Sequence, residues 1–458
     1  MSMTCPNGVP CLSAPVSPRP SDLRVRARLN YSRPSRSSAF EKFHVAVLLS
    51  VFPCAVFWCP VYTSGALGNV TLLDCALMAL WATSLALFLG TRTQLPYLAR
   101  RCSIVCLSAV LIGCCYAIAA TVFGRTENMV SDVLRFMKIF GFPSIIPLSI
   151  CLASKARIHR LLTGAALVSL IFNIGVSFTG YQDKLPLFNH FSELTAGQEF
   201  RPTGAVSNPN DYGYMSVASL AFAAAWWCST KIAPAFHRLL CFGAIVTSLY
   251  GIASSGSRSA MVGLFCGGVY FVTTQHISIA KKIGFVGVFV GFVMSAWQLS
   301  AVFQERMDTA ITQRSQELNF VGRLEAQAIS VRTWVAWPLG VGSSNMPEAT
   351  TPYATGSQLV GAVRGSDSIY VDMLVGAGID GLALLLICLG SCWRLSSRST
   401  LGPRTGVFRA AIVSMFFFGF ATLAPATSFV APFFFAIVGL AALPEAPPRA
   451  ASARISAK

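Results

Sequence analysis

Two polar stretches interrupt a very apolar chain, and both contain residue types that bind phosphate groups. The first is FRPTGAVSNPNDYG, residues 200–213, and the second is SSGSRSAM, residues 254–261. In each stretch an arginine, Arg201 or Arg258, stands close to the start of an apolar run. Arginine presents a planar fork of donors that suits phosphate oxygens, and it keeps its charge at physiological pH. The two stretches therefore predict a site for a phosphate or diphosphate group.

The first stretch also predicts the start of a helix. Asn208 followed by Pro209 is typical of an N-cap and a first-turn proline. The free N–H groups of a helix N-terminus attract anions. An ordinary capped helix with an arginine at the lipid headgroups accounts for these two residues, but it leaves Asn210 and Asp211 without a role. We therefore treat Asn208, Asn210 and Asp211 as candidate substrate-binding residues.

The elements that position these residues are predicted to be transmembrane helices. Of the 458 residues, 54% are hydrophobic and only 12% are charged, which indicates an all-α, polytopic membrane protein. Apolar windows of about 20 residues predict about twelve spans. They lie near 43–61, 70–90, 103–123, 130–152, 161–179, 210–229, 238–254, 259–274, 283–303, 368–392, 407–424 and 426–443.

The net charge of +17 raises the question of nucleic-acid binding. Most of the 35 lysines and arginines fall in the N-terminal tail and in the short segments on the same side of the predicted spans. This is the positive-inside pattern of a membrane protein with both termini in the cytoplasm. A nucleic-acid site needs a contiguous basic face, and here the basic residues are dispersed. We therefore expect no nucleic-acid partner.

The predicted spans divide the chain into five segments. These are a disordered basic cytoplasmic tail (1–42), nine spans with an outside loop at 180–209 (43–303), a large outside loop (304–367), three further spans (368–443) and a second cytoplasmic tail (444–458). Charged and apolar residues alternate at helical spacing over 303–337, which predicts amphipathic helices in the large loop.

Several charged residues of the outside segments are candidates for a site. Arg323 and Arg332 lie in the large loop, and charged groups near a bilayer either pair, line a cavity or extend to lipid headgroups. Asp367 opens the tenth span, where it is either a general base or simply an N-cap. Asp132 and Arg135 have the spacing of a structural helical pair. Carboxylates at metal-ligand spacing are absent from the outside segments, so we predict no metal site and no cofactor.

Four motifs in order over residues 200–381 make the chain similar to a known superfamily. RPTGAVSNPNDYG resembles the R-x-x-G-x-x-x-N-P-N signature of O-antigen ligases and Wzy-type polysaccharide polymerases, and SGSRSA resembles their second arginine motif. GRLEAQAISVRTWVAWPLGVGSSN is similar to the R…W…P-L-G-V-G segment of their large loop. DSIYVDMLVGAGIDG, which contains Tyr370, resembles the stretch that opens the following span.

One departure from the superfamily pattern affects the predicted chemistry. In the ligase branch the last motif begins with histidine and asparagine and carries a glutamate nine residues on, whereas this chain has Asp367, Ser368 and Gly376. The resemblance therefore favours the exopolysaccharide polymerase branch and argues against a histidine-based mechanism.

The resemblance implies a metal-independent, inverting glycosyltransferase in the bacterial inner membrane, with its active site facing the periplasm. Its substrate would be an undecaprenyl diphosphate-linked oligosaccharide, transferred onto a hydroxyl of another lipid-linked glycan. Arg201, Arg258 and Asp367 would be catalytic, while Arg323, Arg332 and Tyr370 would join the substrate-binding residues. Membrane lipids, a chain-length regulator and export machinery are further expected partners. An O-antigen ligase acting on lipid A core, and a flippase or transporter, remain alternatives.

Overall fold

The computed structural model describes a helical protein. The described residues are 39–57, 60–64, 68–90, 97–153, 158–179, 209–229, 235–275, 278–299, 304, 318–354, 368–397, 402–420 and 429–443. The chain divides into two units, Met1–Phe43 and His44–Lys458, and the described part of the first unit is the beginning of one helix. The predicted tails and the loop at 180–209 lie outside the described residues, apart from 39–42 and Pro209.

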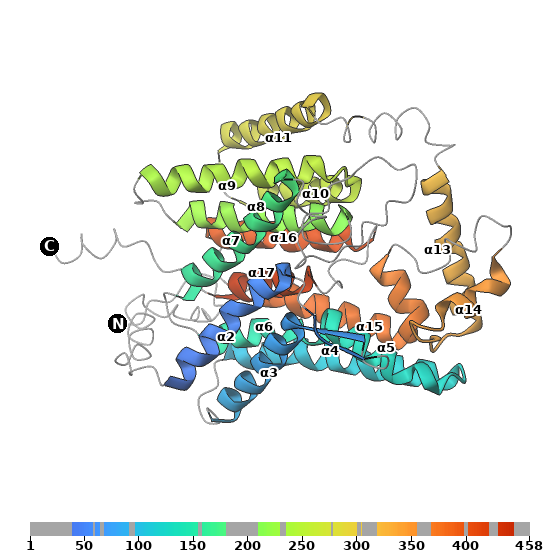
Figure 1. The fold of residues 1–458 in the computed structure, drawn as a ribbon. Coiled ribbons are helices and arrows are strands. Elements are labelled where there is room, and N and C mark those ends of the chain that lie inside the picture. Colours follow the sequence, from blue (N-terminus) through green and yellow to red (C-terminus); the bar gives the residue numbers. More distant parts are fainter. Residues whose placement is uncertain are drawn as a thin grey trace, which may run out of the picture. The chain divides into compact units, whose positions relative to one another are not determined.

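The helices follow the order of the predicted spans (Figure 1). The first half contains α2 (Ala39–Val56), β1 (Pro60–Ser64), β2 (Gly68–Thr71), α3 (Leu72–Gly90), α4 (Tyr97–Val122), η1 (Thr126–Asn128), α5 (Met129–Phe136), η2 (Met137–Gly141), η3 (Pro143–Ile145), α6 (Ile146–Leu152) and α7 (Ile158–Thr179). The second half contains α8 (Pro209–Ser229), α9 (Ala235–Ser254), α10 (Arg258–Thr274), α11 (Ile279–Leu299), α13 (Leu318–Ala336), α14 (Met346–Thr350), η5 (Thr351–Tyr353), α15 (Ile369–Ser397), α16 (Pro403–Phe418) and α17 (Ala431–Ala442).

The all-α fold class is confirmed, with one small exception. The strands β1 and β2 pair as an antiparallel ribbon between the first two helices. Each predicted span overlaps a helix or, for 130–152, a run of short helices. Among the described residues, eight helical segments are long and apolar enough to cross a membrane. The protein is therefore a multi-pass helical membrane protein.

The prediction of about twelve spans is not confirmed for α8, α10, α16 and α17. α10 has 17 residues, at the lower limit for a full crossing, while α16 and α17 have 16 and 12, which is below it. α8 has 21 residues, but its sequence is rich in alanine, serine and other small or polar residues. Helices that pack against other helices need less apolar surface than helices that face lipid. This explains why α8 is less apolar than the eight candidate spans.

Small residues allow α10 and α16 to approach closely. Gly263 and Gly267 lie four positions apart on α10, and a Cβ atom at Gly263 would come within 2.9 Å of the Ser414 carbonyl oxygen. This spacing is the small-residue motif that lets membrane helices pack backbone against backbone. α10 and α16 run in opposite directions, because Gly263 faces Ser414 while Gly406 faces Gln275.

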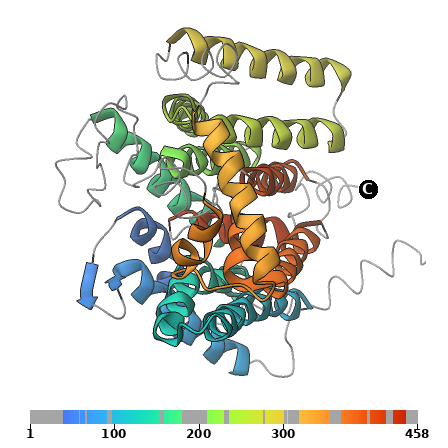
Figure 2. The same cartoon turned by 90° about the vertical axis from the view of Figure 1, so that its right-hand side faces the viewer.

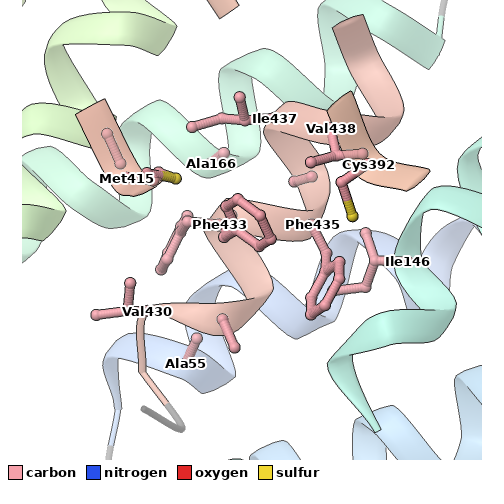
Figure 3. Packing of buried hydrophobic residues seen from close by; sticks show 14 of the residues in the cluster. Ala55, Ile146, Ala166, Cys392, Met415, Val430, Phe433, Phe435, Ile437 and Val438 are labelled. Carbon is pink, nitrogen blue, oxygen red and sulfur yellow. The ribbon is translucent and has the colours of Figure 1, made fainter. Parts of the chain in front are cut away.

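The helix α17 lies in the centre of the core. Every residue from Ala431 to Ala442 is buried, as expected for a helix that is apolar on all sides. The Phe433 ring centroid lies 5.7 Å from that of Phe52, and the Phe435 centroid lies 5.2 Å from that of Phe140. Figure 3 shows Phe433 and Phe435 pointing from α17 toward the neighbouring helices.

Several helix ends meet at one end of the bundle, which we call the loop end. The start of α10 and the end of α16 lie together because the two helices are antiparallel. α15 starts beside them, since the Ile369 N–H donates to the Gly419 carbonyl over 3.1 Å. Figure 1 shows α13 and α14 at this end, and in Figure 2, which faces it, α13 crosses in front.

Candidate functional site

The segment Pro338–Asn345 lies against a break in α15. Gly378 has φ +73°, so the helix is interrupted there. In a regular helix the Ile379 N–H would donate to the Val375 carbonyl. Instead it donates to the Pro338 carbonyl (3.1 Å), and the Val375 carbonyl accepts from the Val341 N–H (2.9 Å). The 338–345 segment thus replaces both halves of the broken helical hydrogen bond.

Glycines make this contact possible. Gly340 and Gly342 have φ of +87° and +84°, a region that other residues rarely adopt. The Gly342 N–H donates to the Gly376 carbonyl over 2.9 Å. A Cβ atom at Gly342 would lie 2.5 Å from Oδ2 of Asp132, so only glycine allows this approach. The P-L-G-V-G motif is therefore a backbone docking element.

The same segment is bound to α5 and η1 by side chains. Asp132 Oδ1 accepts hydrogen bonds from the Ser344 N–H (2.8 Å) and Oγ–H (2.6 Å). Asn128 Nδ2 donates to Oδ1 of the buried Asn345 over 2.7 Å. The segment is thus held between α5 and α15.

An exposed ion pair adds to these contacts outside the membrane spans. Arg125 pairs with Glu348 at 2.7 Å. The hydrogen bond that Arg125 donates to this carboxylate is the main reason that the pKa of the guanidinium is raised.

A small pocket opens where these elements meet. Its volume is about 60 Å³. It contains two carboxylates, one guanidinium, a phenol and a hydroxyl beside apolar side chains. The lining residues are Tyr116, Asp132, Arg135, Phe136, Ile139, Ser343, Ile369, Asp372 and Met373. Ile139 lies in the π-helical turn η2, a feature that often occurs at functional sites.

The two arginine motifs also approach each other at the loop end. A Cβ atom at Gly213 of α8 would lie 2.7 Å from Ser255 Oγ and 3.1 Å from Ser257 Cβ. The N-terminal part of α8 therefore packs directly on the turn that precedes Arg258. Arg258 begins α10, whose N-cap is Ser257, and its side chain is half-buried.

The end of α16 connects this region to the start of α15. The Phe418 ring lies 4.8 Å from that of Tyr214 in α8. The next residue, Gly419, accepts the hydrogen bond from Ile369, which lines the pocket. The turn at Ser255–Arg258, which we call the arginine turn, and the polar pocket thus belong to the same end of the bundle.

The structure describes some of the predicted site residues and not others. Arg201, Asn208 and Asp367 lie outside the described residues, although Asp367 is two positions before the pocket residue Ile369. Arg323 lies within α13, without a described side chain. Arg332, also on α13, is exposed.

The remaining candidates lie at helix starts. Asn210 is half-buried and Asp211 is buried in the first turn of α8. The hydroxyl of Tyr370 donates to the Phe416 carbonyl (3.1 Å), and its ring packs on Phe420. That contact ties α15 to α16.

Asp132 and Arg135, which the helical spacing predicts to pair, both line the pocket, and the hydrogen bonds of Asp132 go to another segment. Among the described residues no ion pair joins them, and Asp132 instead accepts hydrogen bonds from Ser344. With Tyr116 and Asp372 they form the polar part of the pocket. The helical spacing of Asp132 and Arg135 was visible in the sequence, but their partner segment was not.

Within the described part of the chain, no three His, Cys, Asp or Glu side chains gather as metal ligands would.

The fold is that of a multi-pass helical membrane protein. Residues 243–386 match the family model Wzy_C, described as O-antigen ligase. The match extends from α9 through α10, the 338–345 segment and the break in α15. It confirms the resemblance to the O-antigen ligase and Wzy-type polymerase superfamily, and it supports a function of ligase or polymerase type. A search of curated proteins found no match to the chain.

Proposed function

We propose that this protein is a polysaccharide polymerase of the inner membrane. It transfers an oligosaccharide from undecaprenyl diphosphate onto a hydroxyl of another lipid-linked glycan at the periplasmic face. The family match supports glycan transfer of this general type. The observation that supports the proposal is the packing of Gly213, near the start of α8, on the turn that precedes Arg258, because it brings the end of the first predicted phosphate-binding motif next to the second at the loop end.

The reaction is a displacement at the anomeric carbon of the donor sugar. The acceptor oxygen forms the new glycosidic bond from the opposite face, the bond to the diphosphate oxygen breaks, and the acceptor proton passes to a base. The products are the extended glycan and undecaprenyl diphosphate. No metal is required in this scheme, because Arg258 and Arg201 stabilise the charge that develops on the diphosphate. Asp367 is the proposed base, and Asp211 is the second candidate.

Replacing Arg258 tests the phosphate site. We expect Arg258→Gln to lower the rate of polymer formation by about a hundredfold or more, because one fixed donor at a developing charge typically contributes that much. Arg238→Gln is a matched control, since Arg238 is an exposed arginine at the opposite end of α9. The measurement is polymer formation from lipid-linked repeat units by purified protein in bilayer discs. An Arg258→Glu variant that inserts normally and keeps full activity would exclude Arg258 from the mechanism.

The description of the matching family favours O-antigen ligase as a second candidate function. The two activities differ in the acceptor. Purified protein given only lipid-linked repeat units will extend them if it is a polymerase. Product formation that occurs only when lipid A core is added would establish the ligase instead.

A further inference from the structure

The pocket between α4, α5 and α15 has a charge pattern that differs from that of the proposed phosphate site. Asp132 and Asp372 place two carboxylates in its lining, against the single guanidinium of Arg135. Two carboxylates repel a diphosphate, and the guanidinium disfavours a cation. A neutral ligand that both donates and accepts hydrogen bonds avoids both costs.

Asp132 has unused hydrogen-bonding capacity. Its side chain is completely buried, and Ser344 occupies only Oδ1. Among the described residues, no group hydrogen bonds Oδ2. A buried carboxylate oxygen without a full set of donors costs free energy, and a hydroxyl group of a ligand in the adjacent pocket would supply such a donor.

The apolar part of the lining and the size of the pocket also suit a sugar, which has apolar C–H faces beside its hydroxyl groups. Tyr116 and Phe136 lie with ring centroids 5.3 Å apart, and Ile139 and Met373 add apolar surface. Few polar groups in a mostly apolar concave lining are typical of small-molecule sites. The volume of about 60 Å³ holds a few groups the size of water, which suits the hydroxyl edge of a sugar ring.

We infer that this pocket binds a sugar ring of the glycan substrate through its hydroxyl groups, with Asp132 and Asp372 as acceptors and Arg135 as donor. The inference rests on the proposed function, and it separates two tasks within the loop end. The arginine turn at Arg258 binds the diphosphate, while the acidic pocket selects the sugar.

The test measures binding without reaction. The probe is the free oligosaccharide released by mild acid from the cell's own lipid-linked repeat unit, titrated into the full-length protein in bilayer discs. We expect Asp132→Asn and Asp372→Asn each to weaken its binding by about tenfold, the effect of losing one hydrogen bond to a charged group. Glu127→Gln is the matched control, since it removes an exposed carboxylate from the adjacent element η1. Arg258→Gln should weaken the binding of inorganic diphosphate and leave the oligosaccharide affinity unchanged.

A two-substrate assay distinguishes the donor sugar from the acceptor sugar. The Asp372→Asn variant should raise the KM of whichever substrate fills the pocket, with kcat within about twofold, because binding rather than chemistry is affected. If Asp132→Asn disturbs the 338–345 segment through Ser344, Asp372→Asn and Tyr116→Phe still carry the test. Wild-type affinity in the two carboxylate variants, or no binding of the oligosaccharide by the wild-type protein, would overturn the inference. Tight oligosaccharide binding without glycan transfer would refute the proposed function alone.

Discussion

Asn345 illustrates how a single buried side chain holds the site together. It is 2% exposed, its Nδ2 donates to the Val341 carbonyl over 2.7 Å, and its Oδ1 accepts from Asn128. Asn345→Leu removes both hydrogen bonds and leaves polar atoms buried, so we expect a loss of about 1–3 kcal/mol of unfolding free energy. The midpoint of thermal unfolding of the purified protein measures this loss.

Arg125→Gln serves as the control for that experiment. It breaks the contact to Glu348, which joins the same two parts of the chain but is exposed on both sides. Exposed ion pairs contribute little to stability, so the unfolding midpoint should not change. An equal decrease in both variants would mean that burial does not determine the strength of these contacts.

At this scale the sequence identified charged residues but not their partners. The motif containing Arg258 pointed to a helix start, and α10 begins at that residue. Asp132, by contrast, hydrogen bonds to a residue 212 positions away. Helical spacing suggests a neighbour such as Arg135, but it cannot reveal a contact between segments so far apart in the sequence.

Among the secondary-structure elements, the break in α15 at Gly378 determines where the 338–345 segment packs. A Cβ atom at Gly378 would lie 2.5 Å from the backbone carbon of Leu339, and the residue has a positive φ. Gly378→Ala should therefore destabilise the protein by about 1–3 kcal/mol and displace the 338–345 segment. We expect a lower unfolding midpoint and faster proteolysis within that segment.

Gly390→Ala is the control on the same helix. A Cβ atom there meets nothing within 4 Å, and the residue is helical. Alanine is favoured over glycine in a helix by about 0.5–1 kcal/mol, so this variant should be as stable as the wild type or more so. If Gly390→Ala were destabilised as well, the loss of stability would not be specific to Gly378, and the role of its positive φ would be contradicted.

The positions of the helices followed from apolar runs, whereas their irregularities did not. Long runs such as 368–392 correspond to α15, because length and hydropathy directly reflect the thickness of a bilayer. The π-helical turn at Met137–Gly141 and the break at Gly378 depend on tertiary contacts, and periodicity does not predict them.

The proposed orientation of the whole molecule makes a direct prediction. Glu127 is exposed at the loop end, and Arg394 is exposed at the other end of α15. We expect a membrane-impermeant maleimide to label Glu127→Cys from the periplasmic side of intact cells. Arg394→Cys should be labelled only after the inner membrane is opened. Wild-type protein treated in parallel gives the background from native cysteines, and the reverse pattern would contradict a periplasmic active site.

The sequence predicted the class of the molecule but not the arrangement of its site. Low charge and long apolar runs were sufficient for a multi-pass membrane protein, and the motifs were sufficient for the superfamily. The pocket is formed by α4, α5 and α15, of which only α15 lies within the matched residues. The first part of the chain, which matched the superfamily only in the spacing of its spans, thus contributes five of the nine lining residues, among them Tyr116, Asp132 and Arg135.

The exchanged hydrogen bonds at Gly378 have a consequence for biogenesis. While α15 is leaving the translocon, an uninterrupted helix satisfies its own backbone groups in lipid better than a broken one. The broken form becomes favourable once Pro338 and Val341 supply the missing partners. We therefore expect α15 to insert as an unbroken helix and to break at Gly378 only afterwards. The protein would then reach its final fold in a step that follows insertion into the membrane.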